Sequence, residues 1–260
     1  RSARPGDIIN VPFEITVNES YRDFWQSAFY SYDRINTSTP FAHSLGLQNE
    51  VLPFNLMLFL SGSMSHADQA KLQTGFQNGV YHYPGFAGDT FKKRFVVRKL
   101  RTTSDQKHSV ITIHCEIMNQ SGLVVFSCDK TMMFPFQVPP SIEEVLSEEV
   151  AHRSFFLEHL VQQATVLQTK GSQTLSNLRP GQLLLHTLSR PLTLTHSMQL
   201  ASLARLTHEK HFNTLKNSAE ALLVPGGLVL AMSCALTARD LHEVRVLCVL
   251  RIVVLNLISN

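Results

Sequence analysis

The feature that most constrains the fold of this chain is an internal repeat. The segment RPGDIINVPFEITVNESYRDFWQSAFY (residues 4–30) has a counterpart in RPGQLLLHTLSRPLTLTHSMQLASLAR (residues 179–205). Each copy predicts an apolar strand and then a second short strand, Phe13–Val17 in the first and Pro191–Leu194 in the second. Each then enters a helix, for which we expect Asn18 and Thr195 to be the capping residues.

A second pair of segments extends the repeat. EVLPFNLMLFLSGS (residues 50–63) matches LLVPGGLVLAMSCA (residues 222–235), and each has a proline where a helix would begin. Proline suits the first helical turn because its missing N–H would have no partner there. The pattern predicts helices over Leu52–Gly62 and Val224–Leu236. Both are apolar nearly all round, so each must be enclosed, most simply by a curled sheet.

Three runs after the first of these helices alternate apolar and polar residues, which is typical of strands. They are residues 86–103, 108–122 and 123–136, and the last two are joined by the turn Asn119-Gln120-Ser121-Gly122. A long buried helix gripped by an antiparallel sheet is the hot-dog arrangement, an α+β fold. Two repeats predict a double hot-dog in which residues Pro5–Phe134 and Pro180–Val244 superpose.

The repeats divide the chain into three parts. We expect a first hot-dog domain over residues 1–138, a linker helix and loop over 139–178, and a second hot-dog domain over 179–260. Ser141 and Glu144 form a capping-box pattern at the start of the linker helix. After its proline, Pro225, the second repeat has room only for the helix and one or two strands. We therefore expect it to be incomplete at its C-terminal end.

The tail of the second repeat is strongly apolar. Arg245–Ser259 is rich in valine, isoleucine and leucine, which favours a strand. A single strand that is apolar on both faces cannot bury both within one small sheet. We expect it at the open edge of the second sheet or against a neighbouring subunit. The prediction is a protein–protein interface with Arg251 at its rim, as in a subunit of a larger complex.

Composition limits the cellular compartments and the classes of binding partner that the chain is expected to have. The 260 residues carry a formal charge of +3, and the four cysteines show neither a C-x-x-C pair nor zinc spacing, which suggests free thiols in a reducing compartment. The start RSARPGD resembles what remains after a mitochondrial presequence is removed; the other candidate compartment is the cytoplasm. No apolar run reaches the ~20 residues of a membrane span. The basic run Lys92–Arg101 alternates with apolar residues, which favours a solvated strand face; contact with RNA is possible but not indicated.

These segments together resemble the MaoC-like acyl-thioester hydratases, most of all the double hot-dog mesaconyl-CoA hydratases (β-methylmalyl-CoA dehydratases). The resemblance rests on YHYPGFAGDTFKKRFVVRKLR (residues 81–101), with Gly88-Asp89-Thr90 aligned to the family's strand entry. In the second half it rests on HFN (residues 211–213) and LVPGGLVLA (residues 223–231). It implies an enzyme that adds water to an enoyl-thioester without a cofactor or metal, and hence possible binding of acyl-CoA.

The resemblance also implies where the chemistry lies. His211 matches the catalytic histidine, and Gly226 and Gly227 match the helix entry whose N–H holds the thioester oxygen. The candidate catalytic residues are therefore His211, Glu209 and Asn213, and the candidate substrate-binding residues are Gly226 and Gly227.

The departures from the family pattern fall at this same site. Leu206 stands where the family has Asp or Asn, and His208-Glu209 replaces Asn-Pro. Leu228 follows the two glycines where the mesaconyl branch has His. Hydration needs a second polar group to orient the water, and losing one typically costs ~10²–10⁴-fold in rate. Glu209 is the substitute nearest in sequence.

Several interpretations stay open from the sequence. Two interpretations fit His208, Glu209 and His211: their spacing suits metal ligands, and it also suits ordinary polar residues of an exposed loop. Gly226 and Gly227 hold an oxyanion, or simply allow a tight helix entry. The first half has no histidine at the catalytic position. We expect a degenerate site in a repurposed structural subunit of a larger mitochondrial assembly, such as the mitochondrial ribosome. The alternative is an active hydro-lyase that hydrates a short-chain enoyl-CoA of the mesaconyl type.

Overall fold

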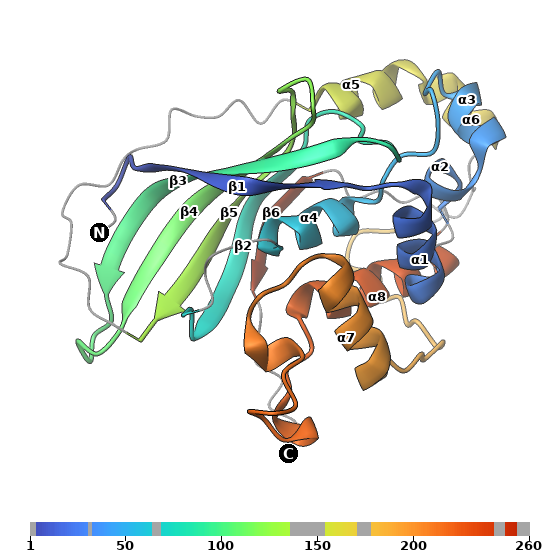
Figure 1. The fold of residues 1–260 in the computed structure, drawn as a ribbon. Coiled ribbons are helices and arrows are strands. Elements are labelled where there is room, and N and C mark those ends of the chain that lie inside the picture. Colours follow the sequence, from blue (N-terminus) through green and yellow to red (C-terminus); the bar gives the residue numbers. More distant parts are fainter. Residues whose placement is uncertain are drawn as a thin grey trace.

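The computed structural model describes residues 4–30, 33–63, 69–135, 154–170, 178–241 and 248–253. Its centre is one six-stranded sheet in the order β1-β3-β4-β5-β2-β6, with every neighbouring pair antiparallel (Figure 1). The strands are β1 (Ile8–Thr16), β2 (Leu72–Tyr81), β3 (Thr90–Thr102), β4 (Ser109–Met118), β5 (Val124–Phe134) and β6 (Cys248–Val253). The three predicted strand runs are confirmed as β3, β4 and β5. The predicted turn between β4 and β5 is confirmed by the bond from the Gly122 N–H to the Asn119 carbonyl (2.9 Å).

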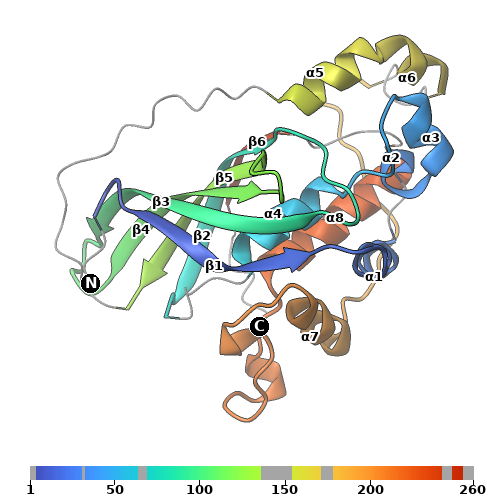
Figure 2. The same cartoon turned by 45° about the horizontal axis from the view of Figure 1, so that its top comes forward.

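Helix α4 (Phe54–Gly62) confirms the first central helix. Pro53 precedes it, and every side chain from Leu56 to Leu60 is buried. α4 packs on β4 and β5 on one side and on α8 (Gly226–Asp240) on another, and Figure 2 shows the two helices side by side within the curve of the sheet. Because α4 is apolar around its whole circumference, it is stable in water only when enclosed in this way.

The second repeat supplies α7 (Leu194–Leu203), the 3-10 turns η2 (Glu209–His211) and η3 (Ala219–Ala221), α8 and β6. α8 confirms the second central helix. β6 follows α8 as β2 follows α4, and these two strands pair antiparallel, Phe76 opposite Ile252 and Val80 opposite Cys248. The repeats therefore meet along equivalent strands, as expected for two units related by an approximate two-fold axis.

The strands predicted at the start of the second repeat, including Pro191–Leu194, are wrong. Residues 182–193 form no strand, and Leu183 and Leu185 are 80% and 76% exposed. The first repeat shows the reason: β1 pairs with β3, and the described part of the second repeat contains no counterpart of β3. An extended segment without a partner strand leaves its backbone groups to water.

One helix cap is confirmed and one is wrong. The Asn18 side chain accepts a bond from the Tyr21 N–H (2.8 Å) at the start of α1 (Glu19–Phe29). In the second repeat α7 begins at Leu194, so Thr195 lies inside its first turn. The cap is Thr193, whose hydroxyl accepts a bond from the His196 N–H (3.2 Å).

The apolar tail is a strand, as predicted, over Cys248–Val253. The location at the open edge of a separate second sheet is wrong, because β6 pairs with β2 of the first repeat. The reason is the pseudo-symmetry: the strand after each central helix forms the junction between the repeats. The interface with another subunit, with Arg251 at its rim, stays a prediction. The rest of Arg245–Ser259 lies outside the described residues.

The remaining helices lie around one end of the sheet (Figure 1). They are α2 (Arg34–Thr37), α3 (Thr39–Ser44), α5 (Phe155–Gln162) and α6 (Ala164–Lys170). In the linker, the Ser154 hydroxyl donates a bond to the Tyr81 carbonyl and caps α5 by accepting the Leu157 N–H. The Ser141 and Glu144 capping box lies outside the described residues, and the boundaries at 138 and 178 stay predictions. No helix in the described ranges is long and apolar enough to cross a membrane.

The interpretation of the basic run as a solvated face is wrong at one position. Lys93 is only 2% exposed and lies between Phe91 and Phe95 on the side of β3 that faces α4. Lys130 on β5 is equally buried. Strand alternation accounts for both, since they occupy the same inward phase as their apolar neighbours.

Candidate functional site

The loop that carries His211 lies close to the start of α8, as the sequence predicts. Arg205 adopts a left-handed conformation (φ 56°) and ends α7. The loop then pairs with the segment just before α8, because the Leu223 N–H donates to the Lys210 carbonyl (2.8 Å). Pro225, two residues after Leu223, is the N-cap of α8. The fold thus brings His211 into the neighbourhood of Gly226 and Gly227.

The contacts of His211 define its chemical state. Its Nδ1 lies 2.9 Å from the Leu223 carbonyl oxygen. A carbonyl only accepts, so Nδ1 carries the proton and Nε2 carries the lone pair of the neutral ring. Burial and the neighbouring His208 lower the pKa of His211, while the bond to Leu223 opposes them. The ring is therefore neutral at pH 7, with Nε2 as its basic atom.

The other two candidate catalytic side chains make their contacts elsewhere. Glu209 is exposed, and both of its carboxylate oxygens accept bonds from Lys216 Nζ (2.9 and 2.8 Å), which lowers the pKa of Glu209. The Asn213 side-chain oxygen accepts the Leu215 N–H (3.0 Å) and so forms a local turn. Leu206 is partly buried and packs against the hydrophobic core. None of these contacts pairs a polar group with His211 Nε2.

His208 anchors the loop instead of binding a metal. Its Nε2 donates to the Ala70 carbonyl (2.9 Å), just before β2, and its Nδ1 accepts the Lys210 N–H (3.3 Å). Both ring nitrogens are therefore occupied, although the ring lies 5.5 Å from that of His211. Within the described ranges no three His, Cys, Asp or Glu side chains are grouped as a metal would require.

Gly227 has a packing role that does not depend on catalysis. A Cβ built at this position would lie 2.7 Å from the Phe59 ring of α4, closer than real Cβ contacts. Gly227 thus allows the two central helices to approach. Gly226 is exposed at the first position of α8, where N–H groups have no partner within the helix. The oxyanion role of these two residues stays a prediction. Leu228, the next residue, is fully buried in the core.

A cavity of about 290 Å³ lies between the two repeats, bounded by α1, the start of α4 and α8. Its walls are mostly apolar, with Gln26, Asp33, Asn36, Asn55, Ser233 and Thr237 as polar members. None of the five candidate site residues lines it. None of the sequence patterns pointed to Asp33, Asn36 or Asn55 as members of a cavity. The repeat could have indicated the first two, because the loop that contains them follows α1 as the His211 loop follows α7.

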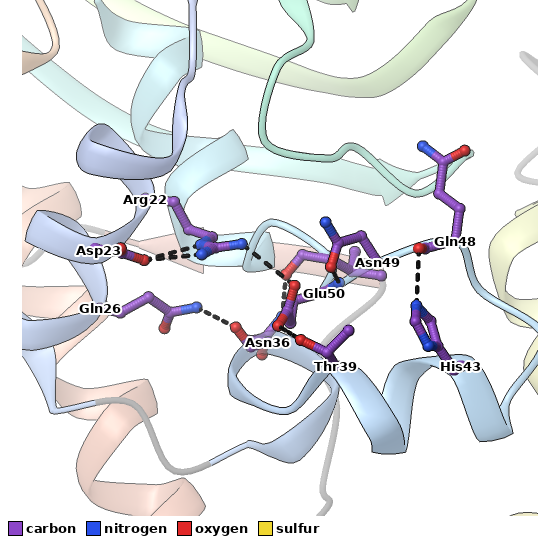
Figure 3. Close-up of polar contacts among 10 residues, drawn as sticks. Arg22, Asp23, Gln26, Asn36, Thr39, His43, Gln48, Asn49 and Glu50 are labelled. Atoms are coloured by element: carbon purple, nitrogen blue, oxygen red, sulfur yellow. Dashed lines mark hydrogen bonds and ion pairs between the residues drawn. The ribbon is translucent and has the colours of Figure 1, made fainter.

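The loop beside this cavity is held by a buried polar network (Figure 3). The Asn36 side chain donates to the Val51 carbonyl (2.6 Å), and the Asn36 carbonyl accepts a bond from Gln26 Nε2 (2.7 Å). Glu50 accepts bonds from Arg22 Nη1 (3.3 Å) and from the Thr39 hydroxyl. These contacts fix the path of the chain from α2 through α3 to α4.

The charge of Glu50 is stabilised inside this network. Burial alone would raise the pKa of Glu50, but the Thr39 hydroxyl, the backbone N–H of Glu50 and the Arg22 charge together hold it below its ordinary value. His43 in the same loop donates to the Gln48 carbonyl (3.1 Å). The role of these polar side chains is thus to hold the loop between α2 and α4 in its conformation.

Comparison with known proteins identifies the fold. No protein-family model matches the sequence, and no curated protein sequence matches it. Among solved structures, a putative MaoC domain protein dehydratase from Chloroflexus aurantiacus matches 92% of this chain and 72% of its own length (TM-score 0.76, 22% identity). A conserved hypothetical protein from Mycobacterium tuberculosis with a double hot-dog fold matches 95% of this chain and 78% of its own (TM-score 0.69, 15% identity).

The chain has the double hot-dog fold. A MaoC-like dehydratase is a further structural neighbour, with a TM-score of 0.55 and 14% identity. The predicted fold class is confirmed, including a second repeat that is only partly present in the described residues. The similarity to MaoC-like dehydratases is confirmed as a shared double hot-dog fold; the mesaconyl-CoA branch is a finer assignment and stays a prediction.

Proposed function

We propose that this double hot-dog protein has a degenerate hydratase site and serves as a structural subunit of a larger mitochondrial assembly, such as the mitochondrial ribosome. The observation that supports a degenerate hydratase site is the environment of His211. Leu206 replaces the acidic residue, Glu209 is bound to Lys216, and Asn213 holds its own turn. Among the residues that the structure describes, no contact places a second polar group at His211 Nε2, and such a group is worth ~10²–10⁴-fold in rate.

The position of the cavity supports the same conclusion. An enoyl-thioester hydratase needs its base at the wall of the acyl pocket. Here the cavity lies between α1, the start of α4 and α8, and His211 is not among the residues that line it. The surfaces of the second repeat support a role in assembly, because Leu183, Leu185 and Leu215 are largely exposed. Exposed apolar residues mark a protein-binding surface where they form one contiguous patch.

One observation favours the alternative, an active hydro-lyase acting on a short-chain enoyl-CoA of the mesaconyl type. The bond from His211 Nδ1 to Leu223 fixes the tautomer, and the lowered pKa keeps Nε2 basic at neutral pH. A general base needs both properties. They become useful only if a second group joins His211 when substrate binds.

Gentle purification of the tagged full-length protein from native organelles tests the assembly. We expect it to elute with other subunits, and we expect a variant that lacks residues 245–260 to be released from them. Circular dichroism and thermal melting of the truncated variant provide the control for folding. A monodisperse monomer at every stage, with residues 245–260 resistant to proteolysis, would contradict the subunit role.

A further inference from the structure

Four reactive side chains meet on the buried side of the sheet, away from His211 and away from the cavity. They are Lys93 on β3, Cys115 on β4, and Cys128 and Lys130 on β5. Both thiols are fully buried, and both lysines are 2% exposed. The three strands are adjacent and are covered by α4 (Figure 1). The proposed function does not use any of these residues.

The two cysteines have the positions that a disulfide requires. Cys115 and Cys128 are direct partners in the ladder between β4 and β5. Residues opposite each other on antiparallel strands have Cα atoms about 4.5 or 5.5 Å apart, within the range of about 4.4–6.8 Å found in disulfides. Their thiols share a hydrogen bond, and both cysteines are free in this structure.

Two lysine nitrogens lie beside these thiols. Lys93 Nζ donates to the Leu60 carbonyl and Lys130 Nζ to the Ser61 carbonyl, both at 3.1 Å. These carbonyls belong to the last turn of α4. Cys115 Sγ lies 4.0 Å from the same Ser61 carbonyl. Burial lowers the pKa of Lys93 to about 7 and also lowers the pKa of Lys130, while the neighbouring thiols oppose both shifts.

The charges distinguish the two sulfurs. Burial alone would raise the pKa of Cys115, but the hydrogen bond from Cys128 and the charges of Lys93, Lys130 and the adjacent His114 lower it to about 7. Burial raises the pKa of the Cys128 thiol well above its ordinary value, and its bond to Cys115 adds to the rise. Of the two thiols, Cys115 therefore loses its proton more readily than Cys128.

We propose that Cys115 and Cys128 are a peroxide-sensitive thiol pair that closes to a cross-strand disulfide, with Cys115 as the attacking sulfur and Lys93 and Lys130 as positioning residues.

The Cys115 thiolate attacks one oxygen of hydrogen peroxide, the O–O bond breaks, and hydroxide leaves and is protonated to water. The Cys128 sulfur then attacks the sulfenic acid on Cys115. The S–O bond breaks, and the Cys128 proton leaves with the hydroxyl as a second water. Two thiols lose two electrons, and peroxide is reduced to two waters. This inference does not depend on the proposed function.

The test treats reduced, full-length protein with dilute hydrogen peroxide, blocks the remaining thiols in denaturant, and maps the peptides by mass spectrometry. We expect the loss of two hydrogen atoms, a linked peptide pair that contains Cys115 and Cys128, and full reversal by dithiothreitol. Cys234→Ser is the matched control, because Cys234 is the third cysteine with a described side chain and its pKa is raised to about 11. Cys234→Ser should form the same linked pair at the parent rate.

Two further variants test the division of roles. In Cys128→Ser, the sulfenic acid should stay on Cys115 and be trapped by dimedone, whereas Cys115→Ser should give no label on Cys128. Lys93→Met removes one charge and keeps the apolar stem. It should move the midpoint of the oxidation rate against pH upward by about 1 unit or more from about 7. If this variant does not fold, the parent midpoint decides: near 7 supports the proposal, and near an ordinary thiol value overturns it.

Other outcomes also overturn the proposal. Cys115 and Cys128 could remain free thiols while Cys234 is oxidised. Cys115 could pass directly to sulfinic acid without a linked peptide, or dimedone could label Cys128 instead of Cys115. The first result means that the pair packs the sheet without redox chemistry, and the other two mean that it is oxidised by a route other than the proposed one.

Discussion

The two repeats begin with nearly the same sequence pattern and reach different structures. In the first, the segment after Arg-Pro-Gly is β1, paired with β3, and α4 is enclosed by the sheet and by α8. In the second, residues 182–193 form no strand and α8 keeps an exposed face. The difference teaches that a strand or a buried helix depends on the partner that covers it as much as on its own residues.

The largest expected effect comes from matched positions in the two central helices. Met57 and Val229 both lie four residues after the helix-opening proline, yet Met57 is fully buried and Val229 is 46% exposed. Met57→Ala should lower the free energy of unfolding by ~2–5 kcal/mol. Val229→Ala should lower it by less than ~1 kcal/mol. Urea denaturation of both variants checks this, and equal losses would mean that α8 is covered as fully as α4.

The next effect concerns the contact between these helices. Gly227→Ala places a methyl group against Phe59, and the strain should cost ~1–3 kcal/mol of stability. Gly226→Ala, at an exposed position, is the control and should be close to neutral. Adding Phe59→Leu to Gly227→Ala should recover part of the loss in thermal unfolding. If the two alanine variants melt together, α8 does not approach α4 through Gly227.

These two predictions separate what the sequence could show from what it could not. Strands β3–β5 were predictable because their alternation is local, and the central helices because a proline opens a long apolar run. Asn18 was predictable as a cap because capping also depends on neighbouring residues. The coil at 182–193 and the pairing of β6 with β2 were not, because both depend on strands distant in the chain. At the candidate site, the sequence indicated that His211 lies near the start of α8. It gave no indication that Glu209 bonds Lys216 or that Asn55 lines a cavity.

An effect of similar size, but confined to neutral pH, separates the two loops that follow the first helix of each repeat. The pKa of Glu50 is lowered in the folded protein, so its charge contributes stability above the unfolded value of 4.5. That contribution is lost as the pH falls through the folded value. Glu50→Gln should therefore lower stability at pH 7 by ~1–3 kcal/mol and flatten the acid side of the stability curve. Asn213→Ala, in the second loop, should change stability by less than ~0.5 kcal/mol at either pH. Thermal melts between pH 3 and pH 7 check both, and parallel pH curves for Glu50→Gln and the parent would contradict the stabilising role of the Glu50 charge.

The most direct test of the central claim is the hydration of enoyl-CoA by purified protein. Crotonyl-CoA and mesaconyl-CoA are followed with the parent chain, His211→Ala and Leu206→Asp, each first checked for folding. If the site is degenerate, the parent and His211→Ala should both hydrate the substrates at the uncatalysed rate. Only Leu206→Asp, which restores the missing carboxylate, should be able to hydrate them faster. Turnover by the parent that His211→Ala abolishes would contradict the account and establish the second repeat as a working hydratase.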